Sequence, residues 1–400
     1  MTAGLGVAAA VLTPSLLGCA TPEASDTVRR EVQRTLDARA AAVLDHDEHA
    51  YLSHLAPEVV GLYVEERRQF RNLADVPLRS WSYRVVEMDG EGERVTADVE
   101  LRYRLTGYDY APVTSRRQVR LDKRHERWWV TADEPAQGSA QQLWQQGRVR
   151  AVHGKRSLVM GVDQGVERLK ALADRADRAV PAVSDAWPSP WPRRVVVLAP
   201  ASVEAMGALL GAPAAGYRGI AAVTTGETGR TGAVPADRIL VNPSAYTVLS
   251  EFGQDAVLTH ETAHVATRAY TSQATPMWLS EGFADWVAYR GTGRTASQTA
   301  PELQRAVRRG AVPAGLPLDG DFSFGADADG LARAYEGGWL ACELIAERWG
   351  ERKLTEFYRA VGAGRTRAGA VERAVVEQFG TTLKEFTEEW RDYLRERLGG

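Results

Sequence analysis

The stretch that decides the fold is residues 258–286, LTHETAHVATRAYTSQATPMWLSEGFADW. The chain has only seven histidines, and two of them, His260 and His264, lie four residues apart in this stretch. On a helix, residues i and i+4 share a face, so both imidazoles point into one space. Two neutral imidazoles placed in this way can bind the same Zn²⁺. The spacing therefore predicts two zinc ligands on one helix.

Glu261 follows His260 directly, which completes the pattern H-E-x-x-H. One residue along a helix is a large rotation, so its carboxylate faces the water of a bound metal without binding the metal itself. Zinc lowers the pKa of such a water toward about 7, and a neighbouring carboxylate can take the proton. The alternative is a pair of surface histidines on an amphipathic helix. The flanking sequence AVLTHETAHVATRAY is apolar along its inward face, which favours a buried site helix.

A catalytic zinc site usually has three protein ligands and one open position. The third candidate is Glu281, in PMWLSEGFADWVAYR, a predicted helix that starts at Pro276. Asp285 lies four residues after Glu281, so the two carboxylates share a face. We expect Asp285 to accept the second N–H of a ligand histidine, His260, and so to fix its orientation. The alternative is an ordinary acidic helix face, against which the surrounding Trp, Leu and Phe residues argue.

H-E-x-x-H followed by W-L-x-E-G-F-A-x-W resembles the gluzincin metallopeptidases, nearest the aminopeptidase N branch and its peptidase-MA-like bacterial relatives. The resemblance covers roughly residues 190–400. It implies a thermolysin-like domain with a small sheet and a mostly helical C-terminal part. It also implies His260, His264 and Glu281 as zinc ligands, with Glu261 as general base and acid. Tyr335, in AYEGGWLACELIAERWG, would donate a hydrogen bond to the oxyanion; a helical core tyrosine is the alternative.

The chain departs from that family at one motif. Aminopeptidases carry G-x-M-E-N on a strand before the zinc helix, and its glutamate holds the free amine of the substrate. The corresponding stretch, GIAAVTTGETGR (219–230), has no such motif, and the role is not transferred to Glu227. An aminopeptidase, an endopeptidase and a zinc hydrolase with another substrate all stay open.

The N-terminal sequence MTAGLGVAAAVLTPSLLGCA is typical of an export signal rather than of a fold. Leu16-Leu17-Gly18-Cys19 resembles a bacterial lipobox, which implies acylation of Cys19 and anchoring on the outer side of the cell membrane. The expected basic residues are missing, since no Lys or Arg precedes Arg29. A simple secretory signal and a short buried helix are the alternatives. Cys342 is interpreted as a small buried apolar residue.

A length of 400 residues favours two domains. The region 28–55 has helical apolar spacing, and the runs 81–89, 94–105, 115–124 and 127–134 alternate like half-buried strands. A helix followed by an antiparallel sheet resembles the cone-shaped nuclear-transport-factor-2-like fold. The predicted class is therefore α+β, with the following segments: 1–18 signal peptide, 19–27 tether, 28–135 cone-like domain, 136–156 polar linker and 157–400 zinc peptidase domain.

Within the second domain we expect a helix over 158–183, strands at 195–200, 219–225 and 238–245, and helices thereafter. The glycines of the Gly/Pro/Asp-rich loop 309–330 would permit a mobile lid, and whether the loop covers the cleft stays open. His46, His49 and His54 do not share one helix face, so we interpret them as solvated or locally bonded histidines rather than a second metal site.

The sequence predicts an exported, lipid-anchored zinc peptidase that acts on a peptide or protein substrate. With 49 basic and 52 acidic residues, the net charge of −3 gives no electrostatic reason to expect a nucleic-acid partner. The oligomeric state stays open. The main alternative is a catalytically silent binding or scaffold lipoprotein built on a peptidase-like domain. Retention of the base and of all three ligands favours the enzyme.

Overall fold

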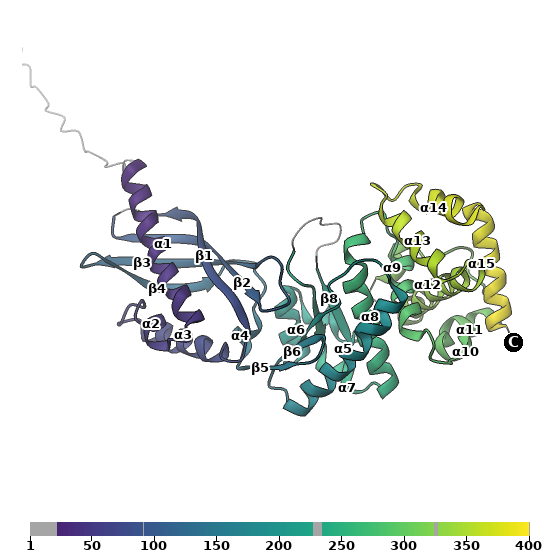
Figure 1. Cartoon of the computed structure of the whole chain (residues 1–400), viewed down its shortest axis with the longest axis horizontal. Helices are drawn as coiled ribbons and strands as arrows, with labels where there is room; N and C mark the ends of the chain where they lie inside the picture. The colour runs from purple at the N-terminus through teal and green to yellow at the C-terminus, as the bar shows by residue number, and fades with distance from the viewer. Residues whose placement is uncertain (1–21, 91, 227–233, 324–326, 400) are drawn as a thin grey trace, which may run out of the picture.

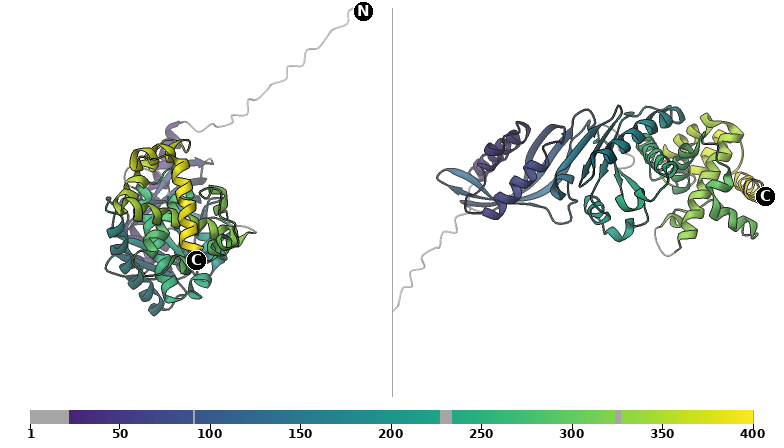
Figure 2. Two further views of the ribbon diagram at one scale, coloured as in Figure 1. Left: turned by 90° about the vertical axis from the view of Figure 1, so that its right-hand side faces the viewer. Right: turned by 90° about the horizontal axis from the view of Figure 1, so that it is seen from below.

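The structure is a computed structural model that describes residues 22–90, 92–226, 234–323 and 327–399. The molecule is elongated, with an N-terminal helix–sheet unit at one end, a second sheet in the middle and a bundle of helices at the other end (Figures 1 and 2). Cys19 and Glu227 lie outside the described residues. Within the described part, no helix combines the length and apolar character needed to cross a membrane.

The N-terminal unit places three helices beside a four-stranded antiparallel sheet in the order β1-β2-β3-β4 (Figure 1). Inward side chains alternate with exposed ones along each strand, which confirms all four predicted strands. The first helix begins at Pro22, so most of the predicted tether is helical, and the third helix was not predicted. The elements are α1 (Pro22–Leu44), α2 (Glu48–Leu52), α3 (Val60–Asn72), β1 (Leu78–Asp89), β2 (Arg94–Leu105), β3 (Val113–Arg124) and β4 (Arg127–Pro135).

Paired charges occupy the interior of this unit. The fully buried Arg39 donates to Glu66 at 2.6 Å and to Asp133 at 3.1 Å. Arg117 donates to the other oxygen of Asp133 at 2.5 Å, and the Tyr51 hydroxyl donates to Glu66 at 2.5 Å. Burial raises the pKa of Glu66, whereas Arg117 and Arg39 outweigh burial and lower the pKa of Asp133. The two cations therefore balance the two anions inside this unit. The nuclear-transport-factor-2-like assignment stays a prediction.

The second sheet has the order β5-β6-β7-β9-β8, with β8 at one edge. Strands β6, β7 and β9 are parallel, while β5 pairs antiparallel with β6 and β8 pairs antiparallel with β9. The segment 136–156, expected as a polar linker, carries a short helix and the first of these strands. The elements are α4 (Leu143–Gln146), β5 (Val149–His153), β6 (Ser157–Val162), β7 (Val195–Ala199), β8 (Ala222–Thr225) and β9 (Arg238–Val241).

The prediction of a helix over 158–183 is wrong at its start, because residues 158–162 belong to strand β6. All six residues of β6 are buried, so the strand shows no alternation, and periodicity cannot distinguish it from a buried helix. The helix itself, α5, spans Val166–Ala186. The strand predicted over 238–245 also ends early, at Val241, because the Asn242 side chain accepts from two backbone N–H groups and starts helix α7 (Pro243–Thr247).

The remaining chain is mostly helical, as predicted, and one close helix pair supports the site. Helices α9 and α12 meet at glycines: a Cβ at Gly282 would collide with the carbonyl oxygen of Gly338, and one at Gly338 would lie 2.7 Å from the carbonyl oxygen of Trp278. Cys342 on α12 is buried and free, as expected. The helices are α6 (Val203–Leu210), α8 (Glu251–Thr267), α9 (Met277–Tyr289), α10 (Ala296–Thr299), α11 (Pro301–Arg308), α12 (Ala328–Trp349), α13 (Glu351–Gly362), α14 (Ala370–Phe379) and α15 (Leu383–Leu398).

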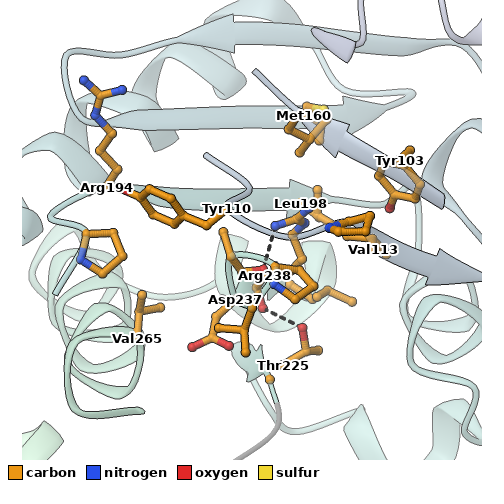
Figure 3. A pocket seen from close by; sticks show the side chains of 18 of the residues that line it. Tyr103, Tyr110, Val113, Met160, Arg194, Leu198, Thr225, Asp237, Arg238 and Val265 are labelled. Atoms are coloured by element: carbon orange, nitrogen blue, oxygen red, sulfur yellow. Dashed lines mark hydrogen bonds between the residues drawn. The ribbon is translucent and has the colours of Figure 1, made fainter. Parts of the chain in front are cut away.

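The second sheet has two different neighbours. One face, with Leu198 and Leu240, shares its core with the N-terminal unit, and the other, with Val197 and Ile239, packs against α5 and α8. Where the first face meets the N-terminal unit there is a cavity of about 880 Å³. Figure 3 shows apolar residues from both sides lining it, including Tyr103, Val113, Met160, Leu198 and Val265. The cavity also reaches helix α8 (Glu251–Thr267), since Val265 and Ala266 of this helix line it.

Candidate metal centre

Helix α8 carries the H-E-x-x-H residues and has a well-defined start. The Ser250 hydroxyl accepts from the backbone N–H of Gly253 at 3.2 Å, and Glu251 in the first turn complements the helix dipole. Helix α9 begins directly after Pro276, as predicted. The two helices pack against each other, so residues from both can reach one point.

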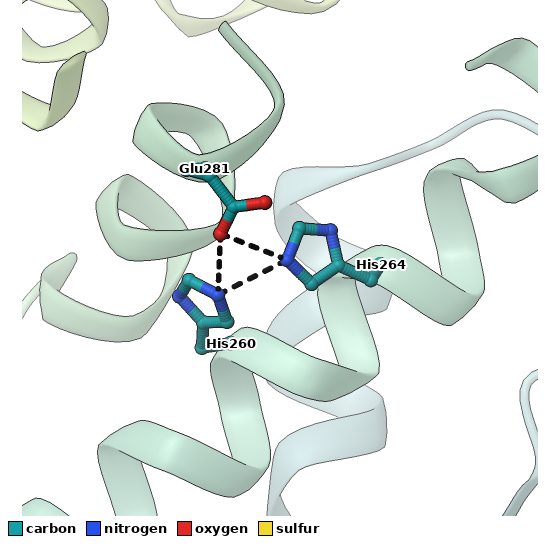
Figure 4. A group of neighbouring side chains, drawn as sticks. All are labelled: His260, His264 and Glu281. Atoms are coloured by element: carbon teal, nitrogen blue, oxygen red, sulfur yellow. Dashed lines mark hydrogen bonds and ion pairs between the residues drawn. The ribbon is translucent and has the colours of Figure 1, made fainter. Parts of the chain in front are cut away.

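His260, His264 and Glu281 lie together at this point (Figure 4). The two Nε2 atoms are 3.0 Å apart, and Glu281 Oε2 lies 3.2 Å from Nε2 of His260 and 3.4 Å from Nε2 of His264. Ligands bound to one tetrahedral zinc at about 2.0–2.1 Å are about 3.3 Å apart. The separations therefore fit three corners of one tetrahedron. Among the described residues, no other group of three His, Cys, Asp or Glu converges in this way, the three N-terminal histidines included.

The charges around these atoms favour a cation. Asp285 Oδ1 lies 2.7 Å from His260 Nδ1, as expected, which places the proton on Nδ1 and leaves Nε2 free to bind a metal. Burial lowers the pKa of His260, but Asp285 and Glu281 outweigh it and raise that pKa well above its usual value. Burial alone would raise the pKa of Glu281. The two neighbouring histidines have the larger opposite effect, so the pKa of Glu281 is lowered overall. The side chains are only 12–16% exposed, so this electrostatic field is weakly screened.

Glu261 points from α8 toward strand β8 and is 7% exposed. The hydroxyl of Thr224 lies 2.5 Å from its Oε2 atom and 3.1 Å from its backbone carbonyl oxygen. Sequence reasoning did not identify Thr224, because one threonine in a strand-forming run is not distinctive. The contact joins residues 37 positions apart and becomes visible only in the folded chain.

Tyr335 lies on α12 with its ring at 5.2 Å from that of Phe322 in a T-shaped contact. Burial raises the pKa of Tyr335, and the charges of Glu281, Asp285 and Glu261 raise it further. The structure brings His260, His264, Glu281 and Asp285 together, with Glu261 on the same helix as the two histidines. No contact joins Tyr335 to these residues in the described part of the chain, and Cys19 lies outside that part.

No protein-family model matches the sequence, and no curated protein matches it. Solved structures that resemble it include yeast LTA4 hydrolase, at 12% identity, 68% of this chain, 43% of that chain and a TM-score of 0.37. An M1 zinc metallopeptidase from Deinococcus radiodurans matches at 16% identity, 70% of this chain, 59% of that chain and a TM-score of 0.33. A protein of unknown function from Mycobacterium tuberculosis matches at 10% identity, 32% of this chain, 80% of that chain and a TM-score of 0.24. At these scores the likenesses establish no family, and the function must be inferred from the site itself.

Proposed function

We propose that the chain is a zinc-dependent peptidase that hydrolyses peptide bonds, with Glu261 as general base. The observation that carries this proposal is the convergence of His260 Nε2, His264 Nε2 and Glu281 Oε2 at 3.0–3.4 Å from one another. Three ligands with one open corner are typical of catalytic zinc, whereas structural zinc sites are closed by four.

Each residue has a distinct part in the proposed reaction. Zinc in such a site supplies Lewis acidity and lowers the pKa of water toward neutrality. His260, His264 and Glu281 would hold the ion, and Asp285, 2.7 Å from His260 Nδ1, would keep that imidazole in the required tautomer and orientation. Glu261 accepts the proton of the attacking water and then delivers it to the nitrogen of the leaving amine. The peptide C–N bond breaks as that nitrogen is protonated.

The oxygen of the attacked carbonyl gains negative charge during this reaction and needs a hydrogen-bond donor. Tyr335 on α12 is the candidate donor, because a tyrosine hydroxyl carries a proton at neutral pH. The family resemblance assigns the same role to this tyrosine. Whether the enzyme removes terminal residues or cleaves within a chain depends on groups beyond these six.

Cleavage of a peptide library by the purified protein tests the proposal. We expect cleavage that stops with 1,10-phenanthroline and returns with stoichiometric Zn²⁺, while the non-chelating isomer 1,7-phenanthroline has no effect. Absence of cleavage at full zinc occupancy would favour the silent binding or scaffold protein. Hydrolysis of esters or amides outside peptides, with the library intact, would favour a different zinc hydrolase.

Export and lipid anchoring at Cys19 are part of the same proposal and rest on the N-terminal sequence alone. Cys19→Ser removes the thiol that would be acylated, so we expect the protein to move from the membrane fraction to the soluble fraction. Fractionation of cells followed by immunodetection measures this. An unchanged membrane fraction would contradict lipid anchoring.

A further inference from the structure

The edge strand β8 presents its residues to two different environments. In its antiparallel pairing with β9, Thr224 lies opposite Ile239 and Thr225 opposite Arg238. Successive strand residues point to opposite faces of a sheet. Thr224 therefore faces α8, and its hydroxyl reaches Glu261. Thr225 faces the cavity between the sheet and the N-terminal unit (Figure 3).

The Thr224 hydroxyl has one proton to donate and two acceptors within reach. Glu261 Oε2 lies at 2.5 Å, and the Glu261 carbonyl oxygen lies at 3.1 Å. The contact with Oε2 is the shorter of the two, so we assign the hydroxyl proton to the hydrogen bond with Oε2. The hydroxyl of Thr224 therefore bonds to Oε2 of Glu261 and not to Oε1.

The position of β8 beside α8 is fixed by contacts other than this bond. Arg268, the residue directly after α8, donates to Asp237, the residue directly before β9, at 3.0 Å. Gly226, directly after β8, lies against this ion pair, and a Cβ there would collide with the carboxylate of Asp237. The end of the strand is thus locked to the end of the helix. These contacts involve neither Thr224 nor Glu261, so they support the position of the strand independently of the bond between those two residues.

We propose that Thr224 positions the general base, holding Oε2 of Glu261 so that Oε1 alone exchanges protons with the attacking water and the leaving amine. This inference rests on the proposed peptidase function. Thr224 does not touch the metal ligands in any described contact. Its loss should therefore impair the step that needs an aligned carboxylate and leave zinc and substrate binding nearly unchanged.

Kinetics of three variants test the positioning role. Thr224→Val removes the hydroxyl at constant shape, and we expect kcat to fall by about 10- to 100-fold with KM changed by less than about threefold and zinc still stoichiometric. Thr224→Ser restores a hydroxyl and should return kcat to within a few-fold of the wild type. Thr225→Val makes the same change on the other face of the strand and should leave kcat unchanged. A wild-type kcat in Thr224→Val, or no recovery in Thr224→Ser, would overturn the proposal.

A second measurement does not depend on activity. Thr224→Val leaves the nearly buried carboxylate of Glu261 without its donor, so we expect Tm to fall by roughly 3–10 °C. In the Glu261→Ala background there is no carboxylate to leave unpaired, and the same substitution should change Tm by less than about 2 °C. This pattern would support the bond even if no peptide is cleaved, in which case the peptidase proposal alone fails. Equal Tm shifts in both backgrounds would overturn the role of Thr224 even in an active peptidase.

Discussion

Replacing Glu261 with glutamine is expected to remove nearly all peptide hydrolysis while zinc stays bound. Glutamine has the shape of glutamate, and its carbonyl oxygen can still accept from Thr224, so the surroundings of α8 should not change. The amide cannot take a proton from water or pass one to the leaving amine. We expect kcat to fall by about 10²- to 10⁴-fold, the usual contribution of a general base, with one zinc per chain retained.

The measurement pairs kcat on a peptide from the library with metal analysis of the same sample. Glu251→Gln is a matched control, because Glu251 is an exposed glutamate in the first turn of the same helix. It should keep the wild-type kcat and zinc content. Undiminished hydrolysis by Glu261→Gln would reject Glu261 as the base, whereas loss of zinc would show that the glutamate also supports the metal.

The ligand set could be predicted from sequence because most of its geometry is local. His260 with His264, and Glu281 with Asp285, each share a helix face through spacing alone. Convergence of the two helices is not local, and it was inferred from the three-ligand chemistry of catalytic zinc. In the structure α8 and α9 pack directly against each other, and α9 also packs closely on α12 where Gly282 meets Gly338. No spacing rule would have predicted that contact between residues so distant in sequence.

Other parts of the site had weaker signals. Tyr335 was implied only by family resemblance, and its place depends on α12 and on Phe322 from the glycine-rich stretch before that helix. Thr224 had no signal beyond membership of a short predicted strand. The positioning role proposed for Thr224 is argued from its place on an edge strand and from the ion pair of Asp237 with Arg268. Both are properties of the folded chain.

The fold could be predicted where burial differs between two faces of an element. Strands β1 to β4 alternate between core and solvent, and their limits were close to the prediction. Strand β6 is buried on both faces, so the same criterion failed there. Helix α3 was missed because its apolar residues include Val60 and Val64, which the structure leaves exposed. The complete burial of Arg39 could not be predicted from the sequence, because its partner Asp133 lies 94 positions away.

Replacing His264 with alanine is expected to remove stoichiometric zinc. Two ligands, His260 and Glu281, would remain, and a catalytic site normally needs three. Wild-type protein at a zinc concentration 100-fold above Kd should gain about 2.7 kcal/mol in stability, and the variant should lose this gain. Metal analysis after dialysis against a weak chelator, together with Tm at increasing zinc concentrations, measures both effects.

Two controls separate loss of a ligand from general damage to the protein. His153→Ala removes an exposed histidine on β5, far along the chain from the site, and should bind zinc like the wild type. Asp285→Asn keeps all three ligands but replaces the carboxylate 2.7 Å from His260 Nδ1, so zinc affinity should fall by about 10- to 100-fold without vanishing. The expected order of affinity is therefore wild type, then Asp285→Asn, then His264→Ala. Full zinc occupancy in His264→Ala would contradict the ligand assignment, because the ion would then be bound without the His264 imidazole.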